Sequence, residues 1–195
     1  MAHLTSIGAG VFSDLAFSTT SVTTTPTTYA DWAAKFATEV APGVAATANS
    51  FRRIKNVREF PALGTPANIV NVPVYGQSIS SQVQGQADAP TLEITLNYVA
   101  NDWKDEANFL GALVGQSVQY YFRFALLNQD SAGTTPATKY ASLAAGLGTV
   151  ANSQWFWVGR IEALVINPQL TDAVTATLTL STQTDFYGAF TADAT

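Results

Sequence analysis

The sequence contains no cysteine, a single histidine and few charged residues. Without cysteine the chain forms no disulfide, no thiolate zinc site and no cysteine nucleophile. The single histidine, His3, leaves no basis for a Ser-His-Asp triad or for a metal site built from several imidazoles. Charged residues make up 12% of the chain, against about 25% in a typical soluble domain. Because so few surface groups must stay hydrated, we expect much of the exterior to be buried against other subunits.

Long apolar runs and an excess of positive charge are absent as well. No segment approaches the ~18 consecutive apolar residues of a membrane-spanning helix, and Met1–Leu4 does not begin like a secretory signal. The sequence therefore predicts no membrane association and folding in a cytoplasm. The net charge is −5, whereas general affinity for nucleic-acid phosphates requires clustered lysine and arginine. The glycines match neither a P-loop nor a dinucleotide fingerprint, so we expect no cofactor.

Residues 91–99 show the clearest pattern in the chain, an alternation of apolar and polar side chains. Leu92, Ile94 and Leu96 recur with period two, which places them on one face of a strand. The polar positions on the opposite face are Thr91, Glu93, Thr95 and Asn97. This segment is predicted to be a strand with one face in the core.

A helix is predicted over residues 102–114, where apolar side chains return at helical spacing. Asn101 or Asp102 can accept hydrogen bonds from its first free amides, and Gly115 can adopt the left-handed conformation that ends it. Further strands are predicted at 51–60, 67–75, 117–127, 154–166 and 173–182. Runs of strands with one well-marked helix indicate a mainly β fold, in which two antiparallel sheets pack as a sandwich or barrel with a flanking helix.

The chain is interpreted as one domain with arms. An N-terminal arm with a short helix is assigned to residues 1–50, the β-sandwich domain to 51–190 and a C-terminal tail to 191–195. The threonine-rich run 18–28 is either a mobile linker or an extended segment along a neighbouring sheet edge, and both interpretations stay open. Long excursions are predicted at 76–90 and 128–153, and loops of about 15 residues in a compact domain are functional or disordered.

Catalysis would have to rest on carboxylates. The candidates are Asp102 with Asp105 or Glu106, and separately Glu93 and Glu162. Paired acids hydrolyse glycosides only when they are held across a sugar cleft. The first three residues have a simpler role, because acidic groups in a first helical turn stabilise the positive end of the helix dipole. We therefore expect no enzymatic activity.

A cluster of basic residues and a run of aromatic residues are candidates for a binding function. Arg52, Arg53, Lys55 and Arg58 would alternate between the two faces of a strand, which favours a solvated edge or a row of inter-subunit salt bridges over DNA contact. The run 155–157, Trp-Phe-Trp, would likewise point to opposite faces. A core tryptophan pair flanking an interface phenylalanine explains it better than a carbohydrate site does.

The order of parts from residue 51 to 186 carries a family resemblance. Two strands lead into a Gln/Gly-rich loop that ends Gly85-Gln86-Ala87-Asp88-Ala89-Pro90, followed by a strand, a helix beginning Asn101-Asp102 and a closing strand pair around 160–182. This order resembles that of the major tail tube proteins of long-tailed, siphovirus-like bacteriophages. The threonine-rich segment and residues 128–153 have no counterpart in that pattern.

The resemblance implies a structural subunit of a phage tail, located in the virion and assembled in the host cytoplasm. Two packed sheets flanked by a helix would form hexameric rings, and the rings would stack into a tube through which DNA passes without binding. Its partners would be copies of itself, a tape-measure protein, a tail terminator and tail-tip proteins. Lumen-lining candidates are Glu93, Thr95 and Asn97. Inter-subunit candidates are Thr23, Thr24, Gln82, Gln84, Arg52, Arg53 and Arg58.

Two other functions remain open. One is a different β-rich virion component, such as a tail terminator or a decoration protein. The other is a carbohydrate-binding or adhesion β-sandwich, for which the tryptophans and the hydroxyl-rich strands are the motivation.

Overall fold

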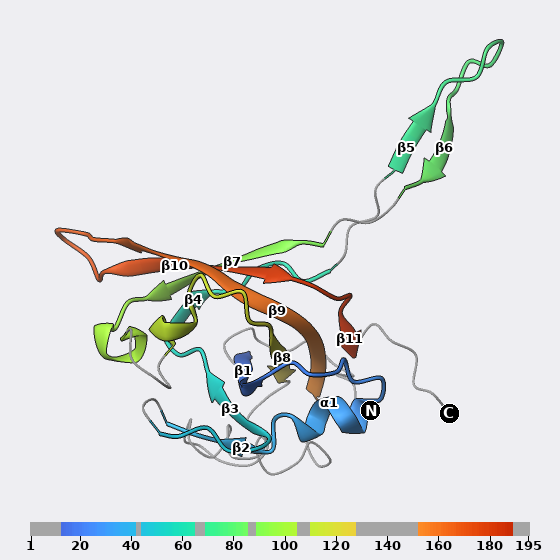
Figure 1. Cartoon of the computed structure of the whole chain (residues 1–195). Coiled ribbons are helices and arrows are strands. Elements are labelled where there is room, and N and C mark those ends of the chain that lie inside the picture. The colour runs from blue at the N-terminus through green and yellow to red at the C-terminus, as the bar shows by residue number, and fades with distance from the viewer. Residues whose placement is uncertain are drawn as a thin grey trace.

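The computed structural model describes residues 13–41, 44–64, 69–85, 89–104, 110–127 and 152–188. Strands dominate this part of the chain, as the alternating patterns predict (Figure 1). The α-helix is α1 (Tyr29–Ala34), and two short 3-10 turns span Ala100–Trp103 and Gly111–Leu113. The strands are β1 (Asp14–Ser21), β2 (Thr38–Glu39), β3 (Ser50–Arg53), β4 (Val57–Glu59), β5 (Ile69–Val72), β6 (Ser81–Gln84), β7 (Thr91–Asn97), β8 (Tyr120–Leu127), β9 (Asn152–Asn167), β10 (Thr175–Thr182) and β11 (Tyr187–Gly188).

One large sheet carries most of the strands, in the order β2-β3-β1-β8-β9-β10-β7-β4, with β11 paired to β9. Its pairs are antiparallel except for β2 and β3, which are parallel. The expectation of two separate packed antiparallel sheets is therefore corrected. A single sheet folds back on itself, and the separate second sheet is the small pair β5–β6.

Strand β9 joins the two halves of the large sheet, and Gly159 marks the change of partner. The first part of β9 pairs with β8, ending at Gly159 opposite Tyr120. The second part pairs with β10, starting at Gly159 opposite Thr182. A Cβ at position 159 would lie 2.4 Å from the carbonyl oxygen of Ser181. Only glycine therefore allows the backbones to approach this closely where the sheet turns (Figure 1).

The segment from β3 to β4 links the two ends of the sheet. The Ile54 amide donates to the carbonyl oxygen of Leu15 in β1, and the Asn97 amide of β7 donates to the carbonyl oxygen of Asn56, each at 2.9 Å. Between these bonds Asn56 has a φ of 59°, which turns the chain. The single strand predicted over 51–60 is thus two strands, and they close the folded sheet towards a barrel.

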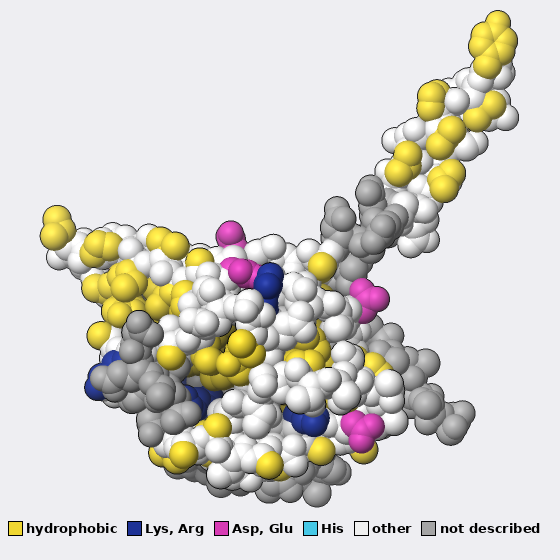
Figure 2. Space-filling view, viewed as in Figure 1, with side chains coloured by type: hydrophobic (Ala, Val, Ile, Leu, Met, Phe, Trp, Pro, Cys, Tyr) yellow, Lys and Arg dark blue, Asp and Glu magenta, His cyan; other side chains and the backbone are white. Residues whose placement is uncertain are grey.

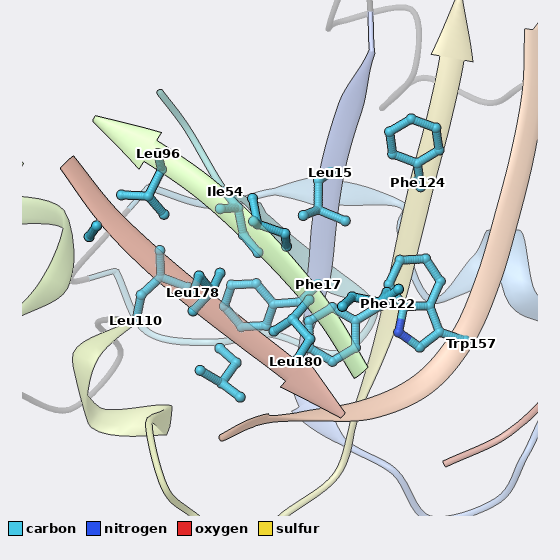
Figure 3. Close-up of a cluster of buried hydrophobic side chains, with 14 of the residues drawn as sticks. Leu15, Phe17, Ile54, Leu96, Leu110, Phe122, Phe124, Trp157, Leu178 and Leu180 are labelled. Carbon is cyan, nitrogen blue, oxygen red and sulfur yellow. The ribbon is translucent and has the colours of Figure 1, made fainter. Parts of the chain in front are cut away.

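The main core fills the space between the two halves of the sheet (Figure 3). Leu15 and Phe17 of β1 lie with Phe122 of β8, and the Phe122 ring stacks on Trp157 of β9 with centroids 5.6 Å apart. The opposite half contributes the apolar alternation that the sequence predicts for β7 and β10: Leu92, Ile94, Leu96, Ala176, Leu178 and Leu180, each at most 2% exposed.

Helix α1 covers the other face of the half that contains β1, β3 and β8. Thr28 caps it by accepting the Asp31 amide through its hydroxyl group. Trp32 is buried and stacks on Phe156 with ring centroids 5.7 Å apart. Phe156 therefore lies beneath the protein's own helix, and the predicted alternation of the run 155–157 is confirmed. The predicted interface role of Phe156 is not confirmed, because packing within the subunit accounts for the burial of this side chain.

Residues 14–21 and 38–39 are strands of the large sheet and helix α1 packs on it, so this part of the chain is not an arm separate from the β domain. β1 lies between β3 and β8, and its first five residues are buried. The first part of the threonine-rich run 18–28 thus pairs with its own subunit. It is neither a linker nor a segment on a neighbouring edge, because β-branched threonines suit a paired strand.

The predicted helix over 102–114 is not formed as one continuous helix. The first 3-10 turn ends where Lys104 adopts an extended conformation, and Val99 precedes that turn without a side-chain cap. Residues 105–109 lie outside the described residues. Gly115 has the expected left-handed conformation, with φ 71°. Its amide donates to the Ile161 carbonyl oxygen at 2.9 Å, which attaches this connection to β9.

Candidate assembly surfaces

The outer side of β7, β10 and the second part of β9 forms a surface that we call the polar face. Its cross-strand pairs include Thr179 with Glu93, Thr177 with Thr95 and Thr175 with Asn97. Opposite residues in an antiparallel pair project to the same side, so these side chains form rows across the strands. The members of the polar face are Thr91, Glu93, Thr95, Asn97, Arg160, Glu162, Ala163, Val165, Asn167, Thr175, Thr177, Thr179 and Ser181.

The three lumen-lining candidates lie together on this polar face. Glu93 and Asn97 are exposed and Thr95 is half-buried, whereas the residues between them are buried in the core. The predicted division of β7 into a core face and an outer face is confirmed. That the outer face lines a lumen stays a prediction.

The charges of the polar face are mostly paired. Arg160 donates to Oε1 of Glu162 from Nε at 3.0 Å and from Nη2 at 2.9 Å. The hydroxyl group of Ser181 donates to the same carboxylate oxygen. Register between β9 and β10 shifts at this point, so Glu162 is the extra residue of a β-bulge. The arginine charge is thereby neutralised beside a row of hydroxyl groups, while Glu93 forms no ion pair among the described residues.

A second candidate surface is the hairpin arm, residues 69–84, which projects from the body of the molecule (Figure 1). It consists of β5 and β6, with Val70 opposite Val83 and Asn71 opposite Gln82. Every residue of these two strands is exposed. The loop or flexible hairpin predicted from residue 76 is in fact the second half of this arm, because residues 81–84 pair with 69–72.

The two faces of the hairpin arm differ in chemistry. Val70, Val72 and Val83 share one face with Ser81, whereas Asn71 and Ile69 share the other with the inter-subunit candidates Gln82 and Gln84. Residues 60–87 contain no charged side chain. Seven of the thirteen large apolar side chains that are exposed among the described residues belong to this arm. Figure 2 shows them along its length.

A third surface is the tip patch at the turn between β9 and β10, formed by Leu170, by Val165 at the border of the polar face and by Ile166 on the opposite side of β9. All three side chains are exposed, and Leu170 is fully so. Val99 lies near this turn. The amide of the residue before it, Tyr98, donates to the carbonyl oxygen of Val174, which follows the turn. In Figure 2 apolar side chains gather at this end of the molecule, opposite the hairpin arm.

The predicted row of basic residues is divided, because Lys55 and Arg58 are exposed whereas Arg52 and Arg53 are buried. Arg52 is 3% exposed and donates from Nη2 to the Val44 carbonyl oxygen at 2.8 Å, and burial lowers the pKa of its guanidinium. Arg53 is also buried, between Asp14 at 3.4 Å and Glu39 at 3.3 Å. Both expectations of a solvated position are therefore wrong.

The other inter-subunit candidates lie at the surface. Arg58 is exposed and lies 3.9 Å from Asp172, a distance and exposure at which an ion pair contributes little. Thr23 and Thr24 have exposed side chains, but their backbone is held by Tyr121, whose hydroxyl group donates to the Thr24 carbonyl oxygen at 2.7 Å. Contacts of these residues with another subunit stay predictions.

The sequence interpretation missed the buried pair of Arg123 and Asp14. Nη2 of Arg123 lies 3.2 Å from Oδ2 of Asp14, and the guanidinium lies over the rings of Phe51 and Phe36, at 4.8 and 5.0 Å from their centroids. Burial lowers the pKa of Arg123, and the charge of Asp14 opposes that shift. The missed signal was the arginine inside an apolar central strand, since a fully buried arginine requires a partner.

The sequence candidates for metal or carboxylate chemistry are only partly described by the structure. Among the described residues, no group of histidine, aspartate and glutamate side chains could hold a metal ion. The carboxylate of Glu162 is held by Arg160 and Ser181 and so is not paired with that of Glu93. His3, Asp105 and Glu106 lie outside the described residues. No helix in the described part of the chain is long and apolar enough to cross a membrane.

No protein-family model and no curated protein sequence matches this chain.

Proposed function

We propose that this protein is the structural subunit of a bacteriophage tail tube. In this role six copies form a ring, and rings stack around a lumen through which DNA passes during ejection. The protein acts by assembly, without catalysis or cofactor, and resides in the virion tail after assembly in the host cytoplasm. Copies of itself are its main partners, with a tape-measure protein, a tail terminator and tail-tip proteins at defined places.

The hairpin arm is the observation that carries this proposal. A two-stranded hairpin is at best marginally stable alone in water. This arm exposes valines on both strands and an isoleucine on β5, and it carries no charged side chain that would keep it apart from other chains. Such a surface favours a protein that works in contact with other subunits over a monomeric enzyme or lectin.

The polar face supports the conduit role. Its threonines and asparagines are uncharged, its arginine is neutralised by Glu162, and Glu93 adds a negative charge. DNA phosphates would find no free cation there, and the negative charge of the subunit would repel them. A lumen lined by Glu93, Thr95 and Asn97 would therefore let DNA slide without binding.

Electron microscopy of the purified protein tests the assembly. Open-ended hollow filaments of uniform width are expected for a tail tube subunit. Single rings that never stack would favour a tail terminator instead. A stable monomer that binds glycans would favour the adhesion alternative.

Glu93→Lys tests the lumen. Tubes should still form, because Glu93 is exposed and outside the core, but they should retain double-stranded DNA at low salt. The matched control is Asp185→Lys, an exposed carboxylate outside strands β7, β9 and β10 with the same change of charge. Equal DNA retention by both variants would contradict the assignment of the polar face to the lumen.

A further inference from the structure

The hairpin arm and the tip patch lie at opposite ends of the same subunit (Figures 1 and 2). The arm projects beyond the start of β7, whereas the tip patch is the turn where β9 passes into β10. Together they hold ten of the thirteen exposed large apolar side chains among the described residues. The apolar surface of the molecule is thus divided between two protrusions.

Both protrusions lack charge. Residues 69–85 contain no acidic or basic side chain, and neither do residues 163–171. Contact between two such surfaces removes apolar area from water. It also avoids the desolvation of ionised groups, which is the main free-energy cost of burying a charged surface. The outer charges Arg160, Glu162 and Asp172 lie at the borders of the tip segment, where they can stay hydrated.

The two surfaces also differ in shape. The hairpin arm presents a flat ribbon with Val70, Val72 and Val83 on one face. The tip patch presents a turn with Leu170 at its end and Val165 and Ile166 on the strand that leads to it. Because the hairpin arm and the tip patch lie at opposite ends, they cannot contact each other within one subunit. They suit a head-to-tail contact between identical subunits, which extends into an open stack.

We infer that the valine face of the hairpin arm docks on the tip patch of a second copy of this chain. This inference deepens the proposed function and rests on it for the repeating stack, since it names the two surfaces through which copies join. The occupant is a second copy because the same polypeptide carries both halves of a charge-free apolar contact. Each joined copy leaves one arm and one tip patch free for the next.

Two single variants separate the halves of this contact. Val72→Asp places a carboxylate on the valine face of the arm, and Leu170→Asp places one in the tip patch. Both side chains are exposed and outside the core clusters, so the body should fold normally by near-ultraviolet circular dichroism. Asn71→Asp is the matched control, because it adds the same charge to the opposite face of the same strand.

Sedimentation velocity over a range of concentrations measures the self-association. Each of the two variants alone should associate at least about tenfold more weakly than the wild type, because an unpaired carboxylate would be buried. Asn71→Asp should associate like the wild type. An equimolar mixture of Val72→Asp and Leu170→Asp should recover joined pairs, since the intact arm of one variant meets the intact tip patch of the other.

Several outcomes would overturn the inference. Normal association of Leu170→Asp alone would show that arms bind arms or another surface. Failure of the mixture to recover pairs would show that the two surfaces do not meet, and a strictly monomeric wild type would remove the second copy. Microscopy distinguishes the two proposals: tubes that survive both variants reject this contact only, whereas arm-to-tip pairs that never form rings or tubes reject the tail tube only.

Discussion

Asp14 and Arg123 form an ion pair of 3.2 Å between side chains that are 4% and 0% exposed. The pair joins β1 to β8 at the centre of the large sheet, and Arg53 of β3 approaches the same carboxylate at 3.4 Å. Three neighbouring strands are therefore tied by one buried acid. Asp14 compensates two cations that have little access to water.

Asp14→Ala should destabilise the protein by about 3–5 kcal/mol, because it leaves the buried guanidinium of Arg123 without its carboxylate and Arg53 with Glu39 alone. Urea unfolding measures the change, and Glu59→Ala, at an exposed edge position, is the control. The double variant Asp14→Leu with Arg123→Met should recover much of the loss, since an apolar pair of similar volume needs no compensation. A loss for Asp14→Ala no larger than the control's would contradict this role.

Gly159→Ala should destabilise the fold by about 1–3 kcal/mol or more, because its Cβ would lie 2.4 Å from the Ser181 carbonyl oxygen, which is backbone. Thermal unfolding measures the effect. Thr177→Ala, an outward position on the adjoining strand β10, serves as the control and should change little. Near-wild-type stability of Gly159→Ala would show that the sheet tolerates a wider crossing at this point.

Trp32→Ala should cost about 3–5 kcal/mol, the usual range for removing a large aromatic side chain from a core. The residue stacks on Phe156 and on Tyr187, at 5.7 and 6.2 Å between ring centroids. Its loss should expose residues 29–36 to proteolysis before the rest of the chain. Ala30→Gly, at an exposed position of the same helix, separates this packing effect from a loss of helix propensity.

Glu162→Gln should raise the affinity of the protein for polyanions, because Arg160 loses the carboxylate that now neutralises it. The salt concentration that elutes the protein from a heparin column measures the change. Asp185→Asn carries the same change in net charge at an exposed position outside the polar face. The double variant Arg160→Gln with Glu162→Gln should return to the wild-type elution. Equal elution of Glu162→Gln and Asp185→Asn would reject the masking of Arg160.

Alkaline pH should weaken the fold partly through Tyr120, whose pKa is raised by burial. The unfolded chain loses the phenolic proton from about pH 10 upward, while the folded chain retains it to higher pH. Stability is therefore full below the unfolded pKa and falls as pH rises towards the folded pKa. Tyr120→Phe should lose less stability than the wild type between pH 8 and 11 in urea titrations. Tyr75→Phe, in the exposed arm, should behave like the wild type.

Local patterns were enough to predict much of the sheet. The alternation in 91–99 and 173–182 determined which side chains of β7 and β10 enter the core, since period two fixes the face of every residue in a strand. The same reasoning placed Glu93, Thr95 and Asn97 on one outer face. Glycine chemistry determined the left-handed turn at Gly115.

The predictions that were wrong concern residues whose burial or conformation depends on partners far away in the sequence. Asp14 and Arg123 are 109 residues apart, and no local pattern shows that an acid in an apparent arm compensates an arginine in a central strand. Arg52 and Arg53 were predicted to be exposed because charged side chains usually are. The chain segments that cover them cannot be identified from the sequence. Residues 102–114 have apolar side chains at helical spacing, yet Lys104 is extended. Trp103 and Leu110, on either side of it in sequence, are packed in the main core.

The sequence by itself determined a β-rich chain with little charge, no cysteine chemistry and a strand whose outer face is polar. Only the tertiary structure decided that residues 14–21 form a central strand, that one sheet folds back at Gly159, and that residues 69–84 leave the body as an uncharged arm. The physical reason is that periodicity fixes the face of a side chain within a strand, while pairing between strands and the burial of charge arise from contacts between residues far apart along the chain.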